Sequence, residues 1–352
     1  MSFLSGREEL MQRGIVLLAL LWYSTGPVRA QAVPEWSERT KLSVLLFGDA
    51  YWMVKNHDPD IEGETGFWFR RIYLTLDHKL AGSADLRLRL EASSPGDFES
   101  SDRLDPIVKD AWVRWRREHT SVIAGLSSSP TWDVVEAFWG YRAVEKTPLD
   151  LQRMGSSPDL GLAFQGSFGA ERRFRYHAML ANGSGTSAET NKGKKVMVSF
   201  GYFPSEALVG ELYGDFEDRN RGEQRATVQA FFGCRWRGGR VGFQLAHQER
   251  DSAGASLVLD LASAFAVVDV GHRMKVFVRV DRMFDPNPEG DRISYLPFSP
   301  RADSTLALTG FEVALAESLS VIPSVEAVFY DHASGEEPDD DLISRVTLSV
   351  HF

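Results

Sequence analysis

Apolar and polar residues alternate along much of this chain, and the pattern is clearest in its last ten residues. From Arg345 to the last residue, one set of alternate positions is apolar and the other is polar. The apolar set is Val346, Leu348, Val350 and Phe352, and the polar set is Arg345, Thr347, Ser349 and His351. Because successive side chains of a β-strand point to opposite faces, this segment is predicted to be a strand with one apolar face and one polar face.

The same alternation recurs in sixteen segments of roughly ten to fifteen residues each, which we interpret as β-strands. They begin near residues 41, 67, 84, 107, 120, 158, 172, 193, 207, 223, 240, 255, 273, 304, 319 and 342. The phase is kept within a segment. Leu86, Leu88 and Leu90, for example, share one face of the third segment, and charged residues occupy the other face.

The connections between these segments alternate in length. Tight turns alternate with longer connections along the chain. Outer-membrane barrels typically have long loops at one rim and short turns at the other. A soluble β-sandwich has no reason to keep this rhythm through eight hairpins. The predicted fold is therefore all-β: a transmembrane antiparallel β-barrel of sixteen strands, with long outer loops and short periplasmic turns. The long connections are 56–66, 94–106, 128–157, 183–192, 285–303 and 332–341, with shorter members at 218–222 and 250–254.

The N-terminal part of the chain has the pattern of a secretory signal peptide. Arg13 precedes an apolar stretch at 14–23, which is too short to span a bilayer as a helix, and a small-residue motif ends at Ala30. We expect cleavage near Ala30 and export to the bacterial outer membrane. The expected organisation is a signal peptide at 1–30, a short N-terminal lead at 31–40 and a single barrel domain at 41–352.

Composition argues against several other classes of protein. The single cysteine, Cys234, excludes an internal disulfide and argues against a metal–cysteine site. A formal net charge of −10 argues against a nucleic-acid partner. Eight histidines are present, but neither a Gly-x-Ser-x-Gly elbow nor a His-Glu-x-x-His motif occurs. We therefore expect no enzyme, no cofactor and no metal, with a barrel enzyme or an adhesion or structural barrel as alternatives.

Basic residues gather on the polar faces of the second to fourth, seventh and eighth predicted strands. A charged residue on a lipid-facing position costs on the order of 2–4 kcal/mol at the bilayer midplane, so these side chains are expected to face an aqueous lumen. Arginine stays charged and binds phosphate or carboxylate in a bidentate way, so a row of arginines could guide anions. In the alternative, these residues pair across strands with Asp77, Asp85, Glu91 and Asp110, and the lumen charge is balanced. The candidate anion pathway consists of Arg71, Arg87, Arg89, Arg114, Arg116, Arg173, Arg175 and Lys195.

The longest connection, 128–157, differs from an ordinary solvated loop. Its middle carries the apolar residues Trp132, Val134, Val135, Phe138 and Trp139. Long ordered loops are usually functional, and a sixteen-stranded barrel is too wide to discriminate small solutes unless something narrows it. We expect this loop to fold inward and form a constriction, or alternatively to cover a subunit interface. The residues expected to face the pore from this loop are Arg142, Lys146 and Arg153.

Several blocks of the sequence resemble a known family. Residues 110–115 (DAWVRW), 157–162 (SPDLGL) and 181–185 (ANGSG), followed by a lysine-bearing segment at 191–195, are similar in order and spacing to blocks of the phosphate-selective porin O and P family. The resemblance covers roughly residues 40 to 352. The terminal Phe352 also resembles the last residue of bacterial outer-membrane barrels, where a terminal aromatic residue is part of the signal read by the assembly machinery.

The resemblance implies a homotrimeric porin whose third outer loop folds into the lumen. Its expected partners are outer-membrane lipid, lipopolysaccharide and small hydrophilic solutes, which would diffuse passively with a preference for phosphate-like or carboxylate anions. Phosphate channels of this family carry many lumen lysines, whereas this chain has nine lysines in total. A general, weakly selective porin with balanced lumen charge is therefore the alternative.

Overall fold

The chain forms sixteen β-strands in the computed structural model, which describes residues 38–352 except 81, 101–102, 156, 221 and 253. The predicted signal peptide at 1–30 and most of the lead at 31–40 lie outside the described residues. The strands are β1 (Thr40–Lys55), β2 (Thr65–Lys79), β3 (Ala84–Ala92), β4 (Ile107–Arg117), β5 (Thr120–Ser127), β6 (Asp159–Phe168), β7 (Phe174–Ala181), β8 (Lys195–Tyr202), β9 (Leu208–Asn220), β10 (Glu223–Trp236), β11 (Gly239–Ser252), β12 (Ala255–Asp269), β13 (Met274–Met283), β14 (Asp303–Ala316), β15 (Leu319–Asp331) and β16 (Asp341–His351).

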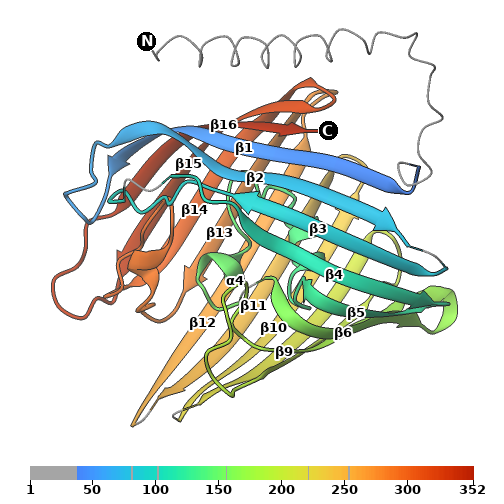
Figure 1. Ribbon diagram of the computed structural model, residues 1–352. Helices are drawn as coiled ribbons and strands as arrows, with labels where there is room; N and C mark the ends of the chain where they lie inside the picture. The colour runs from blue at the N-terminus through green and yellow to red at the C-terminus, as the bar shows by residue number, and fades with distance from the viewer. Residues whose placement is uncertain (1–37, 81, 101–102, 156, 221, 253) are drawn as a thin grey trace, which may run out of the picture. The chain divides into compact units, whose positions relative to one another are not determined.

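The strands close into one antiparallel barrel. Each strand pairs with the next along the chain, and β1 pairs with β16 to close the sheet, as Figure 1 shows. Every predicted strand begins within two residues of an observed one, so the predicted sixteen-stranded barrel is confirmed. The long connections all join strands at one end of the barrel, and the connections at the other end are short; β9–β10 and β11–β12 are the two short connections at the long-loop end. No helix in the described part of the chain is long and apolar enough to cross a membrane.

The two faces of the strands differ as the alternation predicts. Outward side chains in the wall are apolar and exposed, for example Leu212, Leu245 and Val278. Inward side chains include buried charged residues such as Arg279 and Glu326. An apolar outer surface around a closed sheet suits the bilayer core, because every backbone polar group there must be paired within the structure. The barrel is therefore a transmembrane barrel of the outer-membrane type.

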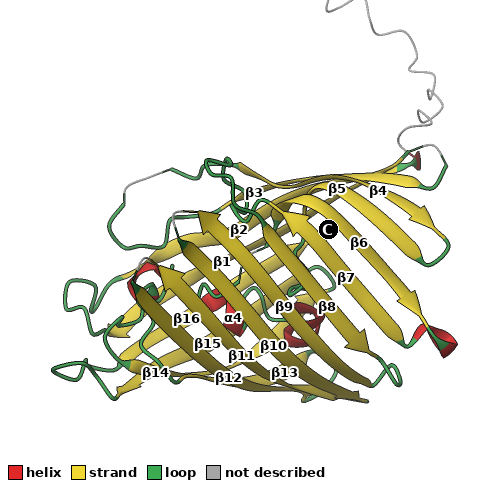
Figure 2. Ribbon diagram, turned by 90° about the horizontal axis from the view of Figure 1, so that it is seen from below, coloured by secondary structure: helices red, strands yellow, loops and turns green. Residues whose placement is uncertain are grey.

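The connection between β5 and β6 contains two short helices, α3 (Asp133–Trp139) and α4 (Pro148–Leu151). Gly140 follows α3 with a φ of 68°, a left-handed conformation that favours glycine at a helix end. Figure 2 shows α4 within the ring of strands. Two further single-turn helices, η1 (Ala170–Arg172) and η2 (Gly290–Arg292), lie in other connections.

Apolar side chains of this connection pack against the inner wall on two sides. On one side, α3 residues share a buried cluster with phenylalanines of β10, β12 and β13; on the other, Leu149 and Met154 share a cluster with inward residues of β7, β8 and β12. Burial of such side chains is the main source of stability in a packed segment. The first cluster includes Val135, Phe138, Trp139, Phe231, Phe265 and Phe277.

We predict that Phe352→Ala lowers the amount of barrel assembled in the outer membrane several-fold without destabilising the folded protein. The Phe352 side chain is 75% exposed, and its backbone exchanges hydrogen bonds of 2.8 and 3.0 Å with Val44, which alanine retains. The measurement compares outer-membrane levels in cells with the unfolding temperature of protein refolded in detergent. Phe243→Ala, which truncates another outward phenylalanine in mid-wall, is the control. Equal outer-membrane levels of the two variants would refute the assembly role.

Candidate functional site

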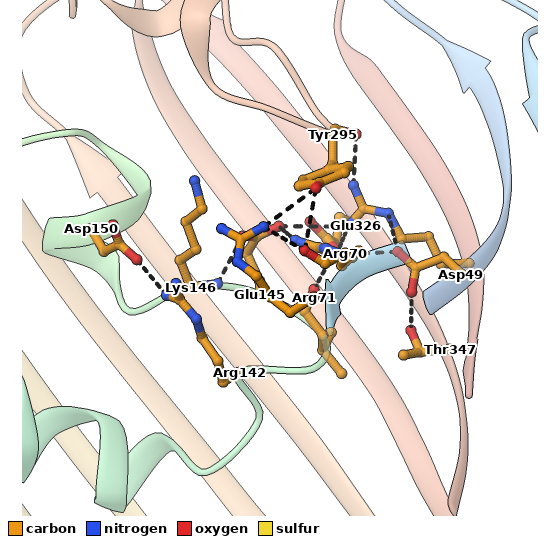
Figure 3. A network of polar contacts seen from close by, with 12 residues as sticks. Asp49, Arg70, Arg71, Arg142, Glu145, Lys146, Asp150, Tyr295, Glu326 and Thr347 are labelled. Carbon is orange, nitrogen blue, oxygen red and sulfur yellow. Dashed lines mark hydrogen bonds and ion pairs between the residues drawn. The ribbon is translucent and has the colours of Figure 1, made fainter. Parts of the chain in front are cut away.

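A network of buried charges fixes the 128–157 connection to the inner wall (Figure 3). Glu145 accepts a hydrogen bond from Arg70 of β2 at 2.8 Å and lies 3.6 Å from Arg345 of β16. Both arginines also face Asp49 of β1, at 3.6 and 3.8 Å, and Arg345 pairs with Glu326 of β15. Two cations are thus shared by three carboxylates, with none of these side chains more than 3% exposed.

The charge state of Glu145 is set by competition between burial and its two arginines. Burial raises the pKa of this carboxyl, but Arg70 and Arg345 outweigh burial and lower the pKa to about 2 from 4.5. A carboxyl whose pKa falls on folding contributes stability above its unfolded pKa. The ionised Glu145 therefore contributes its full stabilisation of the loop above about pH 4.5. This contribution is lost only as the pH falls toward about 2.

Wall side chains also donate hydrogen bonds to backbone carbonyls of the connection. Arg240 of β11 donates to Trp139 O at 2.8 Å and also to Phe138 O, and Arg279 of β13 donates to Lys146 O. Farther along, Gln248 donates to Met154 O at 2.6 Å. Within the connection, the indole of Trp139 donates to Glu145 O at 2.8 Å. The segment is therefore held at several points by strands from different sides of the barrel.

The predicted arginines of β2 to β4 are paired with acidic neighbours. The ion pairs are Arg71–Glu91 at 3.2 Å, Arg87–Asp77 at 2.7 Å, Arg89–Asp110 at 3.2 Å, Arg114–Asp85 at 3.0 Å, and Arg116 with the same Asp85. These carboxylates are the four that the balanced-lumen alternative names as partners. The side chains of Arg87 and Arg114 are nevertheless 31% and 28% exposed, whereas Arg345 is fully buried. The β2–β4 arginines are thus compensated but accessible from the lumen.

Trp112 of β4 orients two of these accessible arginines. Its ring lies 5.4 Å from the guanidinium of Arg87 and 5.0 Å from that of Arg114. A cation over an aromatic face gains roughly 0.5–1 kcal/mol when it is exposed. The inward position of Trp112 and its contact with Arg114, two residues along the same strand, follow from the alternation, but its contact with Arg87 depends on the register of β3 against β4.

A cavity of about 400 Å³ lies at the long-loop end of the lumen. It brings together three of the predicted basic residues: Lys195 of β8 with Lys146 and Arg153 of the connection. Lys146 makes no ion pair with any residue that the structure describes, and burial lowers its pKa. The charged residues lining this outer cavity are Lys109, Lys146, Arg153, Lys195, Arg219 and Arg225, with Asp150, Glu217 and Glu289.

The sequence analysis did not identify three of the cationic residues that line this outer cavity. Lys109, Arg219 and Arg225 stand near strand ends that border outer loops. Arg219 continues the inward set that contains Asp215 and Glu217, so extending the alternation to the end of β9 would have identified it.

The remaining predicted residues, Lys195, Arg142 and Arg173, lie in three different parts of the structure. Lys195 lies 3.3 Å from Asp215 and 3.8 Å from Glu217. Arg142 pairs with Asp150 inside the connection. The placement of Arg173 on the seventh strand is wrong, because β7 begins at Phe174 and the preceding residues form the η1 turn. Arg173 caps the end of η1, between that turn and β7, with its Nε 3.0 Å from Glu171.

Comparison with known proteins identifies the type of barrel. No family model matches the chain, and no curated protein matches it. Among solved structures, an anion-selective porin from Comamonas acidovorans has a TM-score of 0.64 at 11% identity, covering 89% of this chain and 99% of that chain. A loop-deletion mutant of OmpT, an outer membrane protein of Vibrio cholerae, has the same TM-score and coverage at 12% identity. The outer membrane channel DcaP of Acinetobacter baumannii has a TM-score of 0.63 at 8% identity, covering 89% and 97%.

These similarities show the fold of outer-membrane porins. Together with the apolar outer face of the closed sheet, they place the barrel in the bacterial outer membrane. They show the barrel fold and do not extend to the phosphate-selective family that the sequence blocks resemble.

We predict that Glu145→Ala releases the connection from the wall. Removing one partner of a buried ion pair costs on the order of 3–5 kcal/mol, because Arg70 and Arg345 remain buried without it. Trypsin should then cleave folded protein after Arg142, Lys146 or Arg153, which mass spectrometry detects. The control, Glu171→Ala, breaks the exposed pair with Arg173 and should leave the connection resistant. Equal resistance of both variants would show that Glu145 does not anchor the segment.

Proposed function

We propose that the barrel is a porin that lets small hydrophilic solutes diffuse passively across the outer membrane, with a preference for phosphate-like or carboxylate anions. A sixteen-stranded barrel encloses more space than its own wall side chains fill. The inward charges of β2 to β4 and the two helices of the connection would then form opposite sides of the passage. This proposal is consistent with the porin fold and with the anion selectivity of the similar porin from Comamonas acidovorans.

The charge of the outer cavity is the observation that carries the anion preference. Six cationic side chains and three carboxylates line it, so the cavity has an excess of positive charge although the whole chain is acidic. A cleft lined by one sign of charge concentrates ions of the opposite sign. Among the described residues, Lys146 makes no ion pair with a carboxylate, so a solute anion would not have to displace a partner from it.

The accessible arginines of β2 to β4 would then supply a series of weak sites. An anion that replaces one carboxylate at a guanidinium gains bidentate contacts and releases the carboxylate to the next cation. Conduction needs sites that bind and release readily, and paired arginines meet this need better than unpaired ones. The same pairing supports the second candidate function, a weakly selective porin with balanced charge.

We further propose that the 128–157 connection forms the constriction. Its contacts reach strands on several sides of the barrel, so it reduces the open cross-section of the lumen. Arg142, Lys146 and Arg153 would line the narrowed passage, with Arg142 held by Asp150.

We also propose a homotrimer surrounded by outer-membrane lipid and lipopolysaccharide. One of the similar structures is a trimer form of Vibrio cholerae OmpT, with a TM-score of 0.61 at 12% identity. The apolar outer face of the wall is suited both to lipid and to a second copy.

Replacing Arg87, Arg89, Arg114 and Arg116 together by glutamine should move the reversal potential in a KCl gradient toward potassium. The reason is that the wall loses its accessible cations while their carboxylate partners remain. A matched variant also changes Asp77, Asp85 and Asp110 to asparagine, which nearly restores the net charge. If anions pass along these arginines, the matched variant should remain less anion-selective than the wild-type protein. Recovery of the wild-type potential would instead support the balanced lumen.

Deleting residues 133–146 should raise single-channel conductance and weaken selectivity, because the deletion removes α3 and the Glu145 attachment from the lumen. The control is a similar deletion in the outer loop between β15 and β16. Unchanged conductance together with dissociation of the oligomer would favour the subunit-interface alternative.

A further inference from the structure

A second polar region lies at the short-turn end of the lumen. Two adjoining cavities of about 670 and 260 Å³ share Asp133, Val134, Arg175 and Phe203 among their lining residues. One side is formed by α3 and the other by the inner faces of β6 to β9. We refer to the two together as the inner cavity. None of the interactions that anchor the connection to Arg70 and Arg345 involves it.

Glu211 of β9 is an unpaired carboxylate in the wall of the inner cavity. Its side chain lines the smaller cavity, the residue is 5% exposed, and its Oε1 is buried without a hydrogen-bond partner. No ion pair with Glu211 occurs among the described residues, unlike the buried carboxylates of the network around Glu145. A buried carboxyl oxygen without a hydrogen-bond partner is costly, so a group with hydrogen-bond donors is expected to occupy the space beside it.

Arg175 of β7 is the complementary group. Its guanidinium lies 4.0 Å from the centre of the Phe203 ring and makes no ion pair with any described residue. Every other predicted arginine of the anion pathway is paired with a carboxylate. Arg175 can therefore accept an anionic group without displacing one.

The register of three strands sets the distance between these two charges. Arg175 is opposite Gly201 of β8, and Gly201 is opposite Glu211. Two strand spacings separate the backbones of Arg175 and Glu211 by roughly 10 Å, so both side chains can reach one small molecule between them. Gly201 leaves room for the Phe203 ring beneath Arg175, because a Cβ there would lie 2.8 Å from that ring.

The surroundings of Glu211 suit an ammonium group. Asp133 of α3 lines the same cavity and adds a second carboxylate, while Ser199 and His177 supply neutral polar groups. His177 is hydrogen-bonded to Gln165 at 3.2 Å. A metal ion fits this cavity less well than an ammonium group. Among the described residues, the His and carboxylate side chains that lie close enough together to share one ion are Asp303, Asp331 and His332, and these do not line the inner cavity.

We propose that the inner cavity binds small zwitterionic solutes that carry a carboxylate and an ammonium group. Glu211 and Asp133 receive the ammonium, Arg175 receives the carboxylate, and the carbon chain lies against the Phe203 ring, which covers Gly201. This inference rests on the proposed channel function, since the solute reaches the cavity through the lumen. The outer cavity attracts anions in general, and the inner cavity adds recognition of a second, positive group.

The test measures binding directly on the full-length protein in detergent. Isothermal titration calorimetry compares 4-aminobutyrate with butyrate and with butylammonium, which have the same carbon chain but carry one charged group each. We expect 4-aminobutyrate to bind roughly tenfold more tightly than either probe, because each charge-assisted hydrogen bond adds to the binding free energy. Equal affinities for 4-aminobutyrate and butyrate would overturn the proposal.

Two variants test which residue binds which charged group of the solute. Glu211→Gln should weaken 4-aminobutyrate binding roughly tenfold and leave butyrate binding unchanged, whereas Arg175→Gln should weaken both. Glu249→Gln, which changes an exposed glutamate of β11 outside the cavity, is the control and should bind as wild type. Wild-type affinity of Glu211→Gln for 4-aminobutyrate would contradict the assignment.

Conductance separates this proposal from the channel function. Binding by calorimetry without any KCl conductance in planar bilayers would refute the porin and retain the zwitterion site. Conductance without preferential 4-aminobutyrate binding would refute the site and retain the porin.

Discussion

The interior of this barrel depends on one carboxylate, Glu145, which is shared between two buried arginines. Arg70 and Arg345 come from β2 and β16, on either side of β1, where the barrel closes. Asp49 of β1 joins the same network and also accepts a hydrogen bond from Thr347 at 2.7 Å. The interaction that positions the inner connection thus coincides with the closure of the sheet. Further hydrogen bonds from β11 and β13 hold the same segment on the other side of the lumen.

Burial gives arginines of the same barrel two different roles. Where the connection covers the wall, arginines are fully buried and bind carboxylates or backbone carbonyls, so they act as attachment points. Where the wall is left uncovered, along β2 to β4, arginines keep their partners but remain partly exposed. A buried pair is expensive to break, whereas a partly exposed pair exchanges partners at low cost. The position of the connection therefore decides which charges are structural and which can meet solutes.

The alternation of side chains was sufficient to predict the barrel but not the partners inside it. Strand positions depend on local pattern, and sixteen of them were recovered to within two residues. Arg70 was missed because strict alternation assigns the neighbours Arg70 and Arg71 to opposite faces, yet both make ion pairs with inward carboxylates. Arg345 was placed on the polar face correctly, but its partner Glu145 lies two hundred residues earlier in the chain.

The residues that line the two cavities could also be predicted from the sequence only one by one, not as groups. Lys146, Arg153 and Lys195 were each identified from the sequence, but their convergence on one outer cavity requires the fold of the connection. The pairing of Arg175 with the space beside Glu211 depends on the register of three strands and on the absence of a side chain at Gly201. The error at Arg173 has a local cause, since a single helical turn shortened the seventh strand.

The outer cavity is lined by more cationic than anionic side chains although the chain as a whole is acidic, and ion selectivity is the property that shows whether these charges govern transport. The decisive measurement is the reversal potential of the wild-type protein in a planar bilayer under a KCl gradient. We predict a stable conductance whose reversal potential lies toward the equilibrium potential of chloride. A reversal potential toward that of potassium would contradict the proposed anion preference.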